Sequence, residues 1–284
     1  MLPIRLARPH LSQAIAAALG VSILIAPAPA KAEAKLEARY TATLGGITIG
    51  RGIWVIEWRD DQYTATSNGM ATGLLKLFAG GTGTSASRGT VANGQPVARN
   101  YAAAITANKK KDEVEITIEN GTVMDYTAKP PSSPDPERVP ITEAHRRGIT
   151  DPMTASLMRV AGSGDSMTAE ACQRSAAIFD GRMRYDLRLA FKRMEKVKAE
   201  KGYQGPAVVC SVAFVPIAGH IPSRPVVKYL SSNQDMEIWL APIAGTRIVV
   251  PFRIGVPTPF GDAVLEATQF VVSPRVSPTS AKAL

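Results

Sequence analysis

The fold class is decided by the stretch RMRYDLRLAFK, which runs from Arg182 to Lys192. Its apolar and charged residues alternate, and this period of two is the one that a β-strand imposes on its two faces. One face of the strand is predicted to be buried and the other exposed to solvent. The same alternation occurs at 113–119 and at 246–254.

Other stretches predict strands that are buried on both faces, because Ile53–Ile56 shows no alternation and Ala207–Val215 is almost continuously apolar. Turn signals such as Asn93-Gly94 and Asn120-Gly121 separate the strands. Further strands are predicted at 36–44, 62–71, 84–91, 97–106, 236–240 and 263–272. Ten or more strands with short connections predict a mainly antiparallel sheet.

Short helices are expected to interrupt the strands. Thr150 is predicted to cap a helix with Pro152 in its first turn, and Met153, Leu157 and Val160 would then share one face. A second helix is predicted at Thr168–Arg174, and a single turn at Gly73–Phe78.

The domain organisation follows from three further segments. Residues 1–32 have the pattern of a signal peptide: Arg5 and Arg8 precede an apolar run, and Ala30-Lys31-Ala32 supplies a cleavage site. A retained anchor is the alternative. Five prolines between Pro130 and Pro140 predict an extended connector. We expect one β-rich domain at 33–272, rather than two smaller ones, and a flexible tail at 273–284.

The composition excludes a disordered chain, since 45% of the residues are apolar and 20% are charged. Cleavage after residue 32 would lower the net charge from +9 to +6, with 30 basic against 24 acidic residues. The basic clusters, at 109–111, 146–147 and 192–201, lie apart and lack interleaved aromatic residues. They are interpreted as solvated faces, and no nucleic-acid partner is predicted.

The chain has two cysteines, Cys172 and Cys210, which in an exported protein are most simply paired in one disulfide. The absence of a Cys-x-x-Cys motif argues against a redox role. Neither the cysteines nor His145 and His220 have the close spacing of zinc ligands, so no metal or cofactor is predicted.

No catalytic residue is predicted. A Gly-x-Ser-x-Gly motif is missing, and Gly162-Ser163-Gly164 has the wrong spacing. His145 and His220 are the remaining candidates for a general base, and a structural role is favoured for both. The glycine cluster Gly80-Gly81-Thr82-Gly83 lacks the ending of a phosphate-binding loop and is interpreted as a turn between strands.

An apolar cluster in the first half suggests a ligand site. Trp54, Trp58 and Phe78, with Leu74, Leu75 and Leu77, lie near a glycine-rich loop and can line a cleft in a half-open sheet. Ordinary core packing explains the same residues. His220, in a proline-rich loop after Gly219, is a further candidate. The predicted ligand-binding residues are Trp54, Trp58, Phe78 and His220.

Several motifs resemble the alphaproteobacterial branch of the bacterial family called domain of unknown function 3108. They are Asp151-Pro152-Met153, Cys172 with Phe179–Leu187, Cys210 with Val215–His220, and Asp235–Pro242 followed by Arg247 and Pro251. The resemblance covers Leu36 to Val272. It implies a mainly β fold, with one long antiparallel sheet coiled as an open spiral or half barrel and one or two short helices. It also pairs Cys172 with Cys210 and supplies no catalytic residues.

The sequence therefore predicts a monomeric periplasmic protein without a transmembrane segment in its mature chain. Its expected role is to maintain the envelope by binding a hydrophobic ligand or a partner, namely an envelope lipid, a lipoprotein or a periplasmic protein. An exported hydrolase acting on envelope lipid or polymer is the alternative. A purely structural role without a ligand stays open.

Overall fold

The computed structural model describes residues 33–72 and 81–274. These residues form one sheet of fifteen strands. The first seven are β1 (Ala34–Leu44), β2 (Ile47–Trp58), β3 (Gln62–Ala71), β4 (Gly81–Ala92), β5 (Gln95–Ala107), β6 (Lys110–Glu119) and β7 (Thr122–Lys129). The others are β8 (Met158–Arg159), β9 (Arg174–Phe179), β10 (Arg184–Lys198), β11 (Lys201–Gly202), β12 (Gln204–Ala218), β13 (Glu237–Pro242), β14 (Ile248–Val256) and β15 (Ala263–Pro274).

The strands follow one another as antiparallel neighbours, in the order β7-β6-β5-β4-β3-β2-β1-β15-β14-β13-β12-β10-β9. The first strand pairs with the last along its whole length, from Ala34 opposite Pro274 to Leu44 opposite Ala263. The short strand β11 is parallel to β15. The predicted antiparallel sheet is confirmed.

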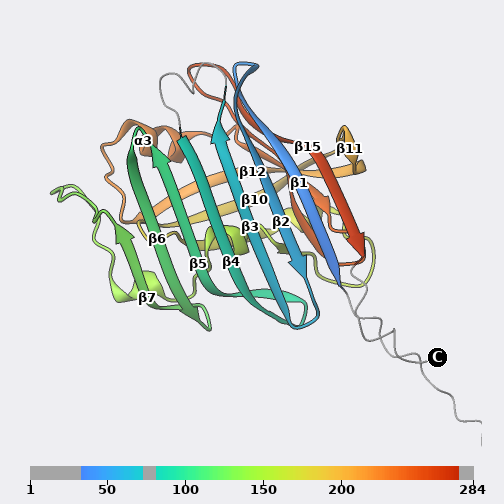
Figure 1. The fold of residues 1–284 in the computed structure, drawn as a ribbon, viewed down its shortest axis with the longest axis horizontal. Coiled ribbons are helices and arrows are strands. Elements are labelled where there is room, and N and C mark those ends of the chain that lie inside the picture. The colour runs from blue at the N-terminus through green and yellow to red at the C-terminus, as the bar shows by residue number, and fades with distance from the viewer. Residues whose placement is uncertain (1–32, 73–80, 275–284) are drawn as a thin grey trace, which may run out of the picture. The chain divides into compact units, whose positions relative to one another are not determined.

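The sheet coils on itself but stays open. Strands β1 to β7 lie in front in Figure 1, and β10 and β12 cross behind them at a steep angle. The two edge strands, β7 and β9, do not pair with each other, and the segment from Arg147 to Thr150 lies between them. Ile149 N donates to Gly121 O at 2.9 Å on one side, and Thr150 N donates to Ala177 O at 2.8 Å on the other. The predicted open, coiled sheet is thus confirmed.

The inner face of the sheet carries two clusters of buried side chains. The larger cluster includes Leu36, Ile56, Trp58, Ile118 and Phe252. The smaller one surrounds a disulfide between Cys172 and Cys210, whose sulfur atoms are 2.01 Å apart. This disulfide ties the 3-10 helix η2 (Ala169–Cys172) to β12.

The predicted helix after Thr150 is wrong in its cap and its length. Asp151 is the cap, because its carboxylate accepts hydrogen bonds from Met153 N and Thr154 N, both at 2.9 Å. Helix α2 (Pro152–Ala155) is a single turn. It ends because β8 pairs with β14, and Val160 N donates to Arg247 O at 2.9 Å, so Leu157 and Val160 share no helical face with Met153.

Other helical predictions differ in smaller ways. The one at Thr168–Arg174 shrinks to η2, because Arg174 already begins β9. Helix α3 (Pro225–Ser232) and the 3-10 helix η1 (Glu143–Arg146) were not predicted. The turn predicted at Gly73–Phe78 lies outside the described residues.

Two predicted boundaries also shift. Gly81 and Gly83 belong to β4 and not to a turn, because their backbones pair with β5. Ser273 and Pro274, expected in the tail, continue β15 opposite β1.

Candidate functional site

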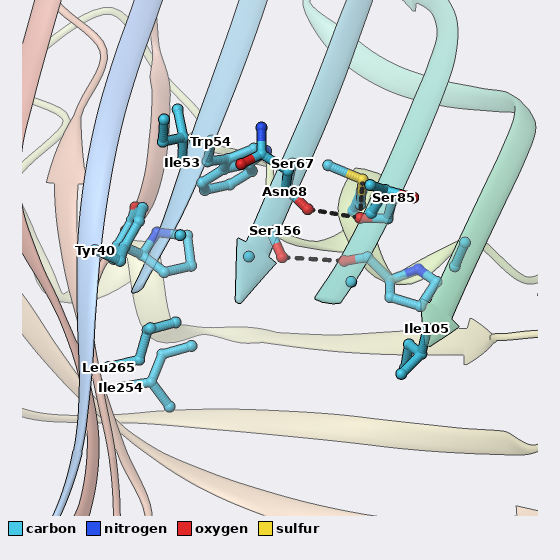
Figure 2. Close-up of a pocket in the computed structure, with 18 of the residues that line it drawn as sticks. Tyr40, Ile53, Trp54, Ser67, Asn68, Ser85, Ile105, Ser156, Ile254 and Leu265 are labelled. Carbon is cyan, nitrogen blue, oxygen red and sulfur yellow. Dashed lines mark hydrogen bonds between the residues drawn. The ribbon is translucent and has the colours of Figure 1, made fainter. Parts of the chain in front are cut away.

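An apolar cavity of about 490 Å³ lies against the inner face of the sheet. This volume is within the range of about 300–1,000 Å³ that is typical of small-molecule sites. Residues from seven strands and from helix α2 line the cavity, and most of them are drawn in Figure 2. The largest are Tyr40 from β1, Trp54 from β2, Tyr101 and Ile105 from β5, Ile254 from β14 and Leu265 from β15.

The cavity exists because three neighbouring strands carry glycine at the same level. Gly52 of β2 lies opposite Gly69 of β3, which in turn lies opposite Gly83 of β4. All three line the cavity. A Cβ atom added to Gly83 would come no closer than 3.9 Å to Ile105, so the space in front of this glycine is empty. The row of glycines removes the side chains that would otherwise fill this part of the interior.

Two residues further along the same three strands, larger side chains narrow the cavity and add polar atoms. Trp54 lies opposite Ser67, and Ser67 lies opposite Ser85. The two serine hydroxyls are 2.8 Å apart, and Ser85 Oγ donates to Met153 Sδ at 3.0 Å (Figure 2). These hydroxyl groups supply hydrogen-bonding atoms at the wall of an otherwise apolar space.

Helix α2 forms the floor of the cavity with Pro152, Met153 and the following Ser156. It is held inside the sheet by Asp151, which is fully buried. The Asp151 carboxylate also accepts hydrogen bonds from Thr154 Oγ1 and, at 3.0 Å, from Ser87 Oγ. Burial raises the pKa of Asp151 above its usual value, although these hydrogen bonds act in the opposite direction.

Tyr63 completes this buried network. Its hydroxyl is 2.6 Å from Thr154 Oγ1, and burial raises the pKa of Tyr63 to about 12. The phenol is therefore neutral over the physiological range, and it links β3 to α2 through a hydrogen bond between neutral groups. The network positions the cavity floor.

The residues predicted to bind a ligand lie in different parts of the structure. Trp54 lines the cavity, and its indole Nε1 has no hydrogen-bond partner in the described part of the chain. Trp58 does not line it, because this side chain is buried in the core and stacks on Tyr63 with ring centroids 6.1 Å apart. Phe78 lies outside the described residues.

His220 is elsewhere in the fold. It follows β12, and its carbonyl accepts a hydrogen bond from Val139 N at 2.9 Å. The imidazole is buried, which lowers its pKa and favours the neutral form. Neither His220 nor His145 is among the residues that line the cavity.

Sequence reasoning missed most of the cavity wall, including Tyr40, Tyr101, Ile254 and Leu265. Tyr40 was identified only as part of a strand; its hydroxyl donates to Pro251 O at 2.6 Å and so links β1 to β14. The spacing of Gly50, Gly52 and Gly69 was the available signal, because glycine inside a strand marks a place where side chains are absent.

Several hydroxyl groups at the cavity are engaged in hydrogen bonds within the chain. The Ser67 and Ser85 hydroxyls bond to each other and Ser85 bonds to the sulfur of Met153, whereas the Ser156 and Tyr40 hydroxyls donate to backbone carbonyls. No histidine among the described residues lines the cavity. Within residues 33–72 and 81–274 no group of three or more His, Cys, Asp or Glu side chains is arranged to hold a metal ion.

Comparisons with known proteins agree with the resemblance seen in the motifs. The family described as "Protein of unknown function (DUF3108)" matches residues 39–268. The chain belongs to this family. No curated protein matches the chain.

Among solved structures, the chain is similar to a β-barrel-like protein of domain of unknown function DUF1849 from Brucella abortus. The two share 10% sequence identity with a TM-score of 0.45, over 84% of this chain and 98% of the other. In the part of this family member that the structure describes, no helix is long and apolar enough to cross a membrane.

Proposed function

We propose that the chain is exported to the periplasm, where it binds a hydrophobic ligand in the cavity and helps to maintain the envelope without catalysing a reaction. The observation that carries this proposal is the cavity itself, an apolar space of about 490 Å³ kept open by Gly52, Gly69 and Gly83. The signal-like segment at 1–32 and the Cys172–Cys210 disulfide support export.

The lining defines the class of ligand. Aromatic and aliphatic side chains dominate the wall, and hydroxyl groups occur at Ser67, Ser85 and Ser156. A molecule with a long apolar part and few polar atoms gains most from such a space, since binding removes its apolar surface from water. A lipid acyl chain has this chemistry, whereas a sugar or a nucleotide would lose hydrogen bonds to water.

The test is native mass spectrometry of the full chain, purified after export from a periplasm. We expect a reproducible adduct with the mass of an apolar molecule. Gly83→Leu would place a side chain in the cavity and abolish the adduct. Ala86→Leu adds the same side chain to the exposed face of the same strand, and it should leave the adduct unchanged.

The proposal fails if the wild-type protein is free of ligand and takes up no fatty acid or phospholipid on incubation. It also fails if Gly83→Leu and Ala86→Leu retain equal amounts of ligand, because the bound molecule would then lie outside the cavity. A denaturing spectrum with and without reductant checks that both variants retain the disulfide.

A further inference from the structure

The mouth of the cavity lies toward one end of the sheet, because Ile105, which lines the cavity near the end of β5, is 57% exposed. Because β1 to β7 alternate in direction, the β1–β2 and β5–β6 turns lie at the same end, where β3 finishes and β4 begins. The loop between β14 and β15 joins them, since Gly45 N donates to Asp262 O at 3.0 Å. Helix α3 reaches this loop through Tyr229, whose hydroxyl donates to Pro257 O at 2.7 Å.

Large apolar side chains are exposed at this end. Phe260 at the tip of the β14–β15 loop is 82% exposed, and Ile47 beside the β1–β2 turn is 60% exposed. Ile105 is 57% exposed and also lines the cavity. We call these three residues the apolar rim. Exposure of three large apolar residues around one opening is costly in water, and it favours a partner that buries them.

Basic side chains surround the apolar rim. Lys109 lies in the exposed β5–β6 turn and Lys110 begins β6, and neither makes an ion pair within the described residues. Arg224, just before α3, and Lys228, on α3, are both exposed. The acidic neighbours of the turn, Asp112 and Glu113, are already paired with Arg182 and Lys111.

Among the described residues, two further exposed acidic side chains lie at this end, Asp235 after α3 and Asp262 in the loop beside Phe260. They are outnumbered by the four basic side chains. The end of the sheet that holds the cavity mouth is therefore both apolar and positively charged.

We propose that this end of the sheet docks onto an anionic lipid bilayer, with the apolar rim at the level of the headgroups and Lys109 and Lys110 against lipid phosphates. The proposal rests on the proposed function, because it names the surface from which the cavity takes its ligand. Exposed apolar side chains on separate loops, with basic residues around them, match the chemistry of such a surface. An acyl chain then enters past Ile105 without crossing water.

The experiment is flotation of the purified protein with vesicles of two compositions. One contains phosphatidylglycerol and phosphatidylethanolamine, and the other contains phosphatidylcholine alone. We expect binding to the first, weakened by salt, and little binding to the second. Lys109→Glu with Lys110→Glu should lower the affinity at least about tenfold, since each lysine near an anionic surface contributes about 1 kcal/mol. Phe260→Ser should lower it as well.

Matched controls lie on β10. Lys196→Glu with Lys198→Glu makes the same change of charge at exposed positions at the C-terminal end of β10. Phe191→Ser removes an exposed phenylalanine from the same strand. These variants should float like the wild type. Equal losses in both sets of variants, or equal binding to both kinds of vesicle, would overturn the docking proposal.

The two proposals fail in different ways. Native mass spectra of the same samples show whether the cavity is loaded. A protein that carries ligand but floats with neither kind of vesicle contradicts docking alone. A protein that floats as expected but never carries an apolar molecule contradicts ligand binding. The apolar rim and the basic residues around it would then remain a membrane-binding surface.

Discussion

Strands β2, β3 and β4 have two ends with opposite properties. At one end, Trp58 lies opposite Tyr63, and their stacked rings fill the interior. At the other end, six residue pairs along the ladder, Gly52 lies opposite Gly69, and the cavity occupies the interior. All four residues face inward on the same strands. The difference shows that the cavity depends on which residues lie opposite one another on neighbouring strands. The alternation along a single strand does not determine it.

The packed end should carry most of the stability, so Trp58→Ala is the strongest test. Trp58 is 3% exposed, and its removal leaves a large void. We expect a loss of about 3–5 kcal/mol in the free energy of unfolding, measured in urea. Folded Trp58→Ala protein should still carry ligand. A loss below about 1 kcal/mol would show that this end is not the packed one.

Removal of the disulfide tests the opposite wall of the interior. Cys172 and Cys210 are 38 residues apart in sequence. A disulfide that closes a loop of this length restricts the unfolded chain, and it contributes about 3–4 kcal/mol to the stability in the chain-entropy model. Cys172→Ala with Cys210→Ala should lower the stability by about this amount in urea. Ligand binding at a permissive temperature should persist, because neither cysteine lines the cavity. Loss of binding in folded protein would show that the two walls are coupled.

Asp151 lies between the two ends, and its replacement should have a moderate effect that depends on pH. Asp151→Asn retains one acceptor oxygen for the cap, so we expect a loss of about 1–2 kcal/mol at pH 7. The raised pKa of Asp151 means that the folded state holds the proton more tightly than the unfolded state.

The wild type therefore gains stability as the pH falls from that raised pKa to the ordinary value of 3.8, and the asparagine variant does not. Urea titrations of both proteins between pH 3.5 and pH 7 would measure this. The difference in stability should widen on acidification. A difference that narrows would mean that the carboxylate is stabilised in its charged form.

Trp54→Phe should have the smallest effect on stability. The indole Nε1 of Trp54 lacks a partner in the described part of the chain, so its removal costs no hydrogen bond there. We expect a change within about 0.5 kcal/mol in either direction, because the aromatic ring is retained. Calorimetric melting with and without ligand measures this. A large loss of stability would assign Trp54 to the packed end.

Much of the fold was predictable from short-range patterns. The alternation at Arg182–Lys192 corresponds to β10, and the Asn93-Gly94 turn separates β4 from β5. Strands β7 and β9 were missed, because their short stretches show little alternation and lie beside a predicted connector and a predicted helix. Helix α3 was missed because it begins among prolines at the end of a loop.

The site was harder to predict than the fold. Trp54 and Trp58 have the same identity and face the same side of one strand, yet Trp54 alone of the two lines the cavity. Their roles depend on the residues opposite them, Ser67 and Tyr63, and this requires the register between strands. His220 was chosen for its loop, and no local pattern reveals that this loop lies away from the cavity.

The pairing of β1 with β15 also determines the order in which the sheet can be completed. The strands from β1 to β7 can form by successive hairpins, each closing a short loop as the chain emerges. β1 is the first of them to be made, but its second edge stays unpaired until β15 arrives at the end of the chain. Until β15 pairs with β1, the incomplete sheet therefore exposes an edge that other chains can join. A truncation that removes β15 makes this transient hazard permanent.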